Sequence, residues 1–127
     1  MTLPAGLRLL LVDDEEDFVR TLAERLRLRD VSASVVFDGE SALARLSEER
    51  FDLVVLDVGL PGVSGLQILQ RIREERPGLP VVLLTGNVDA KDGLEGVKLG
   101  AAACLTKPLE LREFLTLLTQ LCTGERQ

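Results

Sequence analysis

Four short apolar runs of this chain each end in a residue with a polar or charged group. The runs, with the residues that end them, are Leu9–Asp14, Leu53–Asp57, Val81–Thr85 and Cys104–Pro108. Such continuous runs are typical of parallel strands buried on both faces, which lose the alternation of a one-sided sheet. Ligands of an open parallel sheet bind in the crevice outside the carboxyl ends of its strands. We therefore expect three carboxylates, a hydroxyl and an ammonium to converge on one crevice.

Strands and helices alternate five times along the chain. The expected strands are about Arg8–Asp13, Ser32–Phe37, Leu53–Asp57, Val81–Thr85 and Ala102–Thr106. The expected helices are about Glu15–Arg29, Glu40–Glu48, Gly65–Glu75, Ala90–Leu99 and Leu111–Leu121. This alternation predicts right-handed βαβ crossovers and an α/β fold with a doubly wound parallel sheet.

Local signals mark several helix ends. Asp38 or Gly39 suits the start of the second helix, and Ser64 with Gln67 fits a capping box before the third. Gly100 is placed to end the fourth helix. That helix is expected to be weak, because it contains two internal glycines, Gly93 and Gly96.

The bulk composition fits a single soluble domain. The chain has 127 residues, of which 46% are hydrophobic and 28% charged. We expect one domain over 1–127, with a core from about 7 to 121 and a polar tail or the start of a linker at 122–127. The chain has neither a bilayer-length apolar run nor a signal-peptide start, so a cytoplasmic protein without membrane contact is expected.

Composition also excludes several kinds of site. The net charge of −6 argues against direct nucleic-acid binding, which needs a basic surface. The chain has no histidine, so no histidine acid/base pair or metal ligand is available. Cys104 and Cys122 lie in an expected strand and helix, and their spacing indicates two reduced thiols and neither a metal site nor a disulfide scaffold.

The acidic residues suggest a cation site. Asp13 and Asp14 are adjacent at one strand end, and Asp57 is expected on the neighbouring strand. Three ionised carboxylates in one crevice are costly unless a cation or a proton neutralises them. Mg²⁺ fits best, because it binds carboxylates and completes its shell with waters and phosphate oxygens. The other interpretation, in which Asp14–Asp17 is an acidic helix start favoured by the macrodipole, stays open.

Asp57 is a carboxylate at the carboxyl end of an expected buried strand. A carboxylate there can attack phosphorus and carry an acyl phosphate, and Gly59 lets the backbone approach a metal or phosphate closely. A strand-end aspartate that only starts a turn is the plainer alternative.

Thr85 and Lys107 supply the remaining groups. The Thr85 hydroxyl can donate to a phosphoryl oxygen, and Lys107 can neutralise phosphoryl charge. Pro108 restricts Lys107 to extended geometry and permits a cis peptide bond. Each residue alone is ordinary at a strand end, and the combination on four strands is what indicates a function.

These residues resemble the receiver domain of bacterial two-component response regulators over about Leu7 to Leu121. The acidic pair matches at Asp13 and Asp14, the phosphoacceptor at Asp57, the hydroxyl at Thr85, and the lysine and proline at Lys107-Pro108. The resemblance implies a flavodoxin-like (βα)5 fold with strand order 2-1-3-4-5. It also implies Mg²⁺ held by Asp13, Asp14, Asp57 and the backbone carbonyl of Gly59.

The resemblance further implies a signalling phosphoacceptor and not an enzyme, with only self-phosphorylation and self-dephosphorylation activity. Its partner would be a sensor histidine kinase or a histidine phosphotransfer protein. Thr85, Gly86, Lys107 and Pro108 would bind the phosphoryl group and switch the surface of the fourth helix, fifth strand and fifth helix. That surface would support a phosphorylation-dependent homodimer or act on a C-terminal effector domain absent from this chain.

Cys104 departs from the family pattern, which usually has Tyr or Phe at this switch position three residues before the lysine. A thiol makes fewer contacts than a ring, so a receiver-like interaction module that is never phosphorylated is one alternative. An aspartate-nucleophile phosphatase similar to haloacid dehalogenases is a second, but its general acid would stand where this chain has Gly59. A flavin-binding flavodoxin-like protein is a third, although Asp13–Asp17 would repel the flavin phosphate.

Overall fold

The computed structural model describes residues 3–86 and 91–122, except for the side chains of residues 91 and 92. Its strands are β1 (Arg8–Val12), β2 (Ser32–Val36), β3 (Leu53–Asp57), β4 (Val81–Thr85) and β5 (Ala103–Thr106). Its helices are α1 (Glu16–Arg27), α2 (Gly39–Glu48), α3 (Gly65–Glu75), α4 (Lys91–Lys98) and α5 (Leu111–Cys122).

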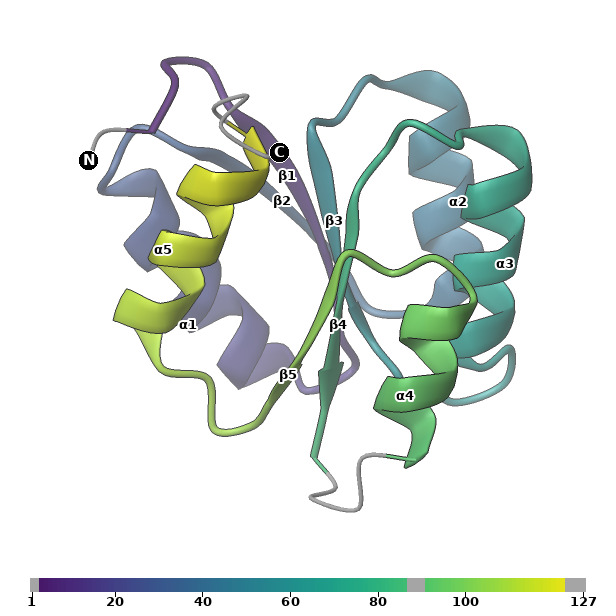
Figure 1. The fold of residues 1–127 in the computed structure, drawn as a ribbon. Helices are drawn as coiled ribbons and strands as arrows, with labels where there is room; N and C mark the ends of the chain where they lie inside the picture. The colour runs from purple at the N-terminus through teal and green to yellow at the C-terminus, as the bar shows by residue number, and fades with distance from the viewer. Residues whose placement is uncertain (1–2, 87–90, 123–127) are drawn as a thin grey trace.

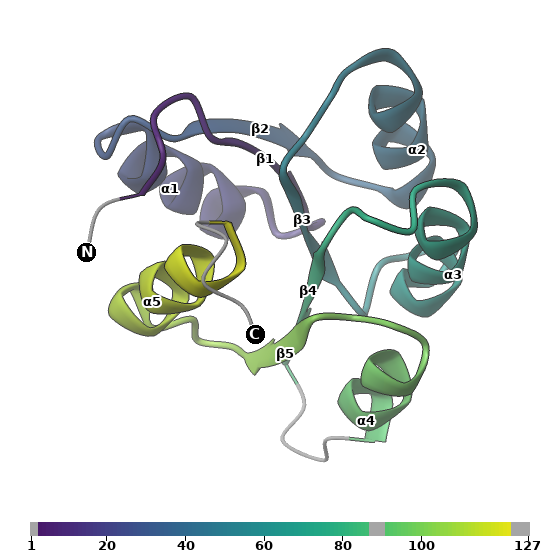
Figure 2. The ribbon, with the colours of Figure 1, turned by 45° about the horizontal axis from the view of Figure 1, so that its top comes forward.

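The five strands form one parallel sheet in the order β2-β1-β3-β4-β5, which confirms the predicted fold and strand order. Helices α1 and α5 cover one face of the sheet, and α2, α3 and α4 cover the other (Figures 1 and 2). In the described part of the chain, no helix is long and apolar enough to span a membrane.

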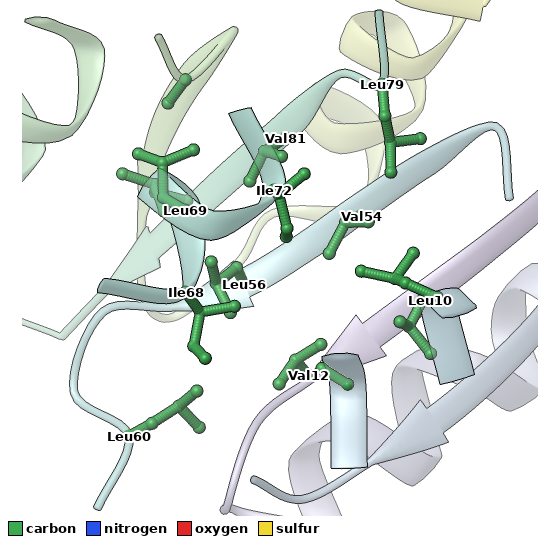
Figure 3. Packing of buried hydrophobic residues seen from close by; sticks show 14 of the residues in the cluster. Leu10, Val12, Val54, Leu56, Leu60, Ile68, Leu69, Ile72, Leu79 and Val81 are labelled. Atoms are coloured by element: carbon green, nitrogen blue, oxygen red, sulfur yellow. The ribbon is translucent and has the colours of Figure 1, made fainter. Parts of the chain in front are cut away.

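The apolar strand residues are buried on both faces, as their continuous runs predict. Leu10, Val12, Val54 and Leu56 pack under α2 and α3 (Figure 3). Alternate residues of the same strands pack under α1 and α5 on the opposite face, around the fully buried Phe114. Burial of this apolar surface stabilises the sheet and fixes the register of its strand ends.

Three helix ends follow the predicted signals. The Asp38 carboxylate accepts a hydrogen bond from the Ser41 N–H at 2.7 Å and caps α2. Ser64 and Gln67 form the expected capping box at α3. Gly100 follows α4 with a φ of +109°, a left-handed conformation that glycine adopts without strain.

Several element boundaries differ from the prediction by one or two residues. Helix α1 ends at Arg27 and not near Arg29, because the chain turns away through Asp30, whose φ is 63°. Helix α5 continues to Cys122, so that residue belongs to the helix and not to the tail. Ala90, the predicted start of the fourth helix, and Thr123–Gln127 lie outside the described residues.

The two glycines inside α4 allow the helix to lie close to the sheet. A Cβ at Gly96 would collide with the buried side chain of Leu83, and one at Gly93 would lie 2.9 Å from the Cys104 Sγ. Larger residues here would push α4 away from β4 and β5. The glycines that weaken the helix in isolation therefore serve its packing.

Candidate functional site

The predicted site residues gather at the carboxyl edge of the sheet. Asp13 and Asp14 follow β1, Asp57 ends β3 and Thr85 ends β4. Lys107 comes directly after β5. Because all five strands are parallel, these ends share one edge, the lower one in Figure 1.

Three carboxylates meet in the crevice at this edge. One oxygen from each of Asp13, Asp14 and Asp57 lies within 4.8 Å of the others. Asp13 is only 1% exposed and Asp57 6%, whereas Asp14 faces solvent. Asp13 Oδ1 accepts a hydrogen bond from the Glu15 N–H at 2.9 Å, and Asp57 Oδ1 accepts one from the Gly59 N–H at 3.0 Å. The two Oδ2 atoms are left facing Lys107.

The Lys107 ammonium is the positive charge of the crevice. Its Nζ lies 2.8 Å from Asp13 Oδ2 and 3.6 Å from Asp57 Oδ2. It also forms an ion pair with the Glu15 carboxylate and lies 5.0 Å from the centre of the Phe18 ring. Sequence reasoning missed both of these partners. Their only signals were the position of Glu15 directly after the acidic pair and that of Phe18 three residues further along α1.

The backbone of Lys107 is hydrogen-bonded to the end of β4. Its N–H donates to the Thr85 carbonyl at 2.8 Å, which joins the ends of β4 and β5. The Lys107–Pro108 peptide bond is cis, the isomer that the sequence permits. The lysine side chain therefore leaves the sheet from a defined point beside Thr85.

Burial and charge shift two pKa values in the crevice. Burial raises the pKa of Asp57 to about 6, and the charges of Asp13 and Asp14 add to this, against the Gly59 N–H and Lys107. Burial disfavours the charged form of Lys107, but the hydrogen bonds that its ammonium donates to Asp13 and Glu15, together with the negative charges of Asp13 and Asp57, raise its pKa above the usual value. The crevice thus has more negative charge than one ammonium neutralises.

The donor set fits a hard divalent cation. Asp13 Oδ2 is buried and, apart from its ion pair with Lys107, accepts no hydrogen bond within the described residues. Carboxylate oxygens from two neighbouring strands converge beside it. Oxygen ligands of this kind suit Mg²⁺, which binds through one or two carboxylates and retains waters.

Thr85, Gly86 and Cys104 lie along the neighbouring strands. Thr85 is buried at the end of β4, and the exposed Gly86 follows it as the last described residue before residue 91. Cys104 is half-buried on β5, in register with Leu83, and its thiol packs against α4 at Gly93. At Cys104, where the family pattern has an aromatic residue, the space beside the side chain is therefore taken up by the backbone of α4 at Gly93.

Comparisons with known proteins agree on one family. A family model described as "Response regulator receiver domain" matches residues 9–119. The "Probable transcriptional regulatory protein TcrX" of Mycobacterium tuberculosis is 40% identical over 104 residues, which cover 82% of this chain and 44% of that protein. The chain spans less than half the length of this relative.

Solved structures give the same result. The "BeF3 Activated DrrB Receiver Domain" superposes with a TM-score of 0.83 at 33% identity, over 91% of this chain and 97% of that one. A CheY-like receiver domain protein from Methanospirillum hungatei has a TM-score of 0.89 at 23% identity, over 95% and 97% of the two chains, a likeness in fold alone.

Proposed function

This chain belongs to the response regulator receiver domain family, and we propose that it accepts a phosphoryl group on Asp57. The donor is the phosphohistidine of a sensor histidine kinase or a histidine phosphotransfer protein. The observation that carries the proposal is the buried Asp57 carboxylate, whose Oδ2 faces the Lys107 ammonium beside the carboxylates of Asp13 and Asp14. Members of this family are signalling proteins and not classical enzymes.

In the proposed reaction an Asp57 carboxylate oxygen attacks phosphorus. The bond between phosphorus and the donor imidazole nitrogen breaks, the nitrogen keeps the electron pair, and the product is an acyl phosphate on Asp57. Asp13, Asp14, Asp57 and the Gly59 carbonyl would hold Mg²⁺, which when bound neutralises charge on the phosphoryl oxygens. Lys107 adds a further positive charge, and the Gly59 N–H on Oδ1 holds the carboxylate in place.

Phosphorylation then switches the domain. It replaces one negative charge with a group of roughly −1.5 to −2 and strong acceptor oxygens. The Thr85 hydroxyl and Lys107 turn toward these oxygens, and Gly86 and Pro108, the residues that follow them, adjust. Because Thr85 ends β4 and its carbonyl binds the Lys107 N–H, the movement biases the surface formed by α4, β5 and α5.

That surface has apolar features suited to association. Leu94 and Val97 are exposed large hydrophobic residues on α4. A groove of about 430 Å³ lies along β5 and α5, between Ala103, Leu105, Thr116 and Leu117. We propose that phosphorylation favours a homodimer, or a contact with an effector domain, through this surface.

The phosphodonor needs a docking surface beside Asp57. An apolar groove of about 410 Å³ lies between α1 and the segment after Lys107, lined by Phe18, Leu22, Pro108 and Leu111. It is next to the crevice because Phe18 contacts Lys107. We propose that a helix of the donor protein packs into this groove and brings its phosphohistidine to Asp57.

The wider setting follows from the relatives. The chain spans less than half of TcrX, whose name is that of a transcriptional regulator. We propose that this chain is a single receiver domain that controls an effector domain, in the cytoplasm, without itself binding nucleic acid. The second candidate, an interaction module that is never phosphorylated, is favoured only by Cys104 at the aromatic position.

The experiment incubates the purified chain with Mg²⁺ and acetyl phosphate and records its intact mass. The expected result is a gain of one phosphoryl group that requires Mg²⁺ and is lost in Asp57→Asn. Asp30→Asn is the matched control, because it makes the same change at a left-handed position that asparagine tolerates. No gain with acetyl phosphate or with a histidine kinase would favour the unphosphorylated module.

A further inference from the structure

Glu15 is the partner of Lys107 that lies outside the set of strand-end aspartates. The Lys107 Nζ contacts Asp13 and Asp57 toward the sheet and the Glu15 carboxylate toward solvent. The Asp13 side chain is 1% exposed and that of Glu15 61%. The ammonium thus lies between a buried anion and an exposed one.

The main chain and α1 support this arrangement. The Glu15 N–H donates to Asp13 Oδ1 at 2.9 Å, so Glu15 and Asp13 are tied together at the start of α1. The Phe18 ring, three residues on, lies 5.0 Å from Nζ and adds a cation–π contact on the same side. Both contacts lie on the α1 side of Lys107.

Backbone N–H groups donate to the Oδ1 atoms of Asp13 and Asp57, so the Oδ2 atoms, which Lys107 now contacts, are the oxygens left for a divalent cation. Asp13 Oδ2 is 2.8 Å from the ammonium and Asp57 Oδ2 is 3.6 Å from it. Two cations repel each other, so the ammonium must give up much of its contact with Asp13 when a cation binds. If Lys107 had no other partner, its ammonium would lose the ion pair with Asp13 and gain nothing in its place when the cation binds.

We propose that Glu15 is a positioning residue that holds the Lys107 ammonium at the rim of the crevice while a divalent cation occupies the aspartates. The proposal rests on the proposed function, since it assumes that Mg²⁺ binds here. Glu15 therefore raises Mg²⁺ affinity through Lys107, and this action is separate from the general attraction of a negative charge for a cation.

Titration calorimetry of the whole chain with Mg²⁺ tests the proposal. We expect Glu15→Gln to weaken Mg²⁺ binding about fivefold, the size of a favourable ion pair at a partly exposed position. Glu16→Gln is the matched control, because Glu16 is the next residue, the first of α1, and its side chain is 57% exposed but pairs with Arg20. We expect that variant to change affinity by less than about twofold, since salt screens exposed charges.

Lys107→Ala separates the two routes by which Glu15 can act. In that background we expect Glu15→Gln to change Mg²⁺ affinity by less than about twofold, because no ammonium is left to hold. Equal affinity of Glu15→Gln and the original chain overturns the proposal. A fivefold loss that persists without Lys107, or that Glu16→Gln reproduces, also overturns it. An original chain that binds no Mg²⁺ at all instead refutes the metal site of the proposed function.

Discussion

Gly65 packs against the backbone that follows Asp57 so closely that residue 65 has no room for a side chain. A Cβ at Gly65 would lie 2.7 Å from Val58 Cα and nearer still to the Asp57 carbonyl oxygen. The Gly65 N–H also donates to the Val58 carbonyl at 3.2 Å. The start of α3 therefore fixes the end of β3, from which the Asp57 carboxylate enters the crevice.

We predict that Gly65→Ala lowers the free energy of unfolding by about 1–3 kcal/mol, since backbone atoms must move to admit the methyl group. Urea unfolding followed by far-ultraviolet circular dichroism measures this. Gly78→Ala is the control, because no atom lies within 4 Å of a Cβ there. That variant should be neutral or slightly stabilising, and equal stability of both variants would contradict the packing.

Asp57 should make stability depend on pH in the absence of metal. Burial raises its pKa from the usual 3.8 to about 6 in the folded chain, so the folded state binds the proton more tightly than the unfolded state. The stabilisation that the folded state gains from the proton on Asp57 is complete below about pH 4 and is lost as the pH rises through 6. At pH 7 the free energy of unfolding of Asp57→Asn should therefore be about 1–3 kcal/mol higher than that of the original chain.

Urea unfolding at pH 5 and pH 7 with a chelator measures the Asp57 contribution as the difference between the two proteins. We expect Asp57→Asn to have the larger advantage at pH 7. A difference that does not change with pH would show that the burial of Asp57 does not shift its proton binding.

Lys107→Ala should separate phosphoryl uptake from signalling. The variant should still accept some phosphoryl group, because the nucleophile and the cation ligands remain, but its phosphorylation-dependent association should be weak.

Without Mg²⁺ the Lys107→Ala variant should lose about 1–3 kcal/mol of stability, because two buried aspartates lose their counter-charge. Lys98→Ala in α4 is the control and should stay within about 0.5 kcal/mol. An unchanged association would remove Lys107 from the switch.

Gly93 and Cys104 should be coupled. Gly93→Ala places a methyl group 2.9 Å from the Cys104 Sγ and should destabilise the chain by about 1 kcal/mol or more. Cys104→Ala removes that sulfur, so the double variant should be more stable than the sum of the single changes. Thermal unfolding of the four proteins gives the coupling, and strict additivity would show that α4 does not pack on the thiol.

The strands and the site edge follow from sequence because each depends on a local signal. A run such as Leu53–Leu56 must be buried on both faces, and a parallel sheet then brings Asp13, Asp57 and Lys107 to one edge. The capping residues Ser64 and Gln67 act within one turn of helix. These features need no knowledge of distant contacts.

Other features depend on contacts between distant parts of the chain. Glu15 reads as part of an acidic helix start, and only the fold brings Lys107 to it. In the sequence, Gly93 and Gly96 indicate only a weak helix, and their packing role depends on the contacts of α4 with β4 and β5. The end of α1 at Arg27 depends on the left-handed turn at Asp30, for which the periodic pattern gives no signal.

The most direct test of Asp57 as the phosphoacceptor is to identify the residue that carries the phosphoryl group. The chain is treated with acetyl phosphate and Mg²⁺, the acyl phosphate is reduced with borohydride, and the digested peptides are sequenced by mass spectrometry. An acyl phosphate on aspartate is reduced to homoserine, so we expect homoserine at position 57, and none when Mg²⁺ is withheld. Homoserine at Asp13 or Asp14, or at no position, would contradict the assignment of Asp57 as the phosphoacceptor.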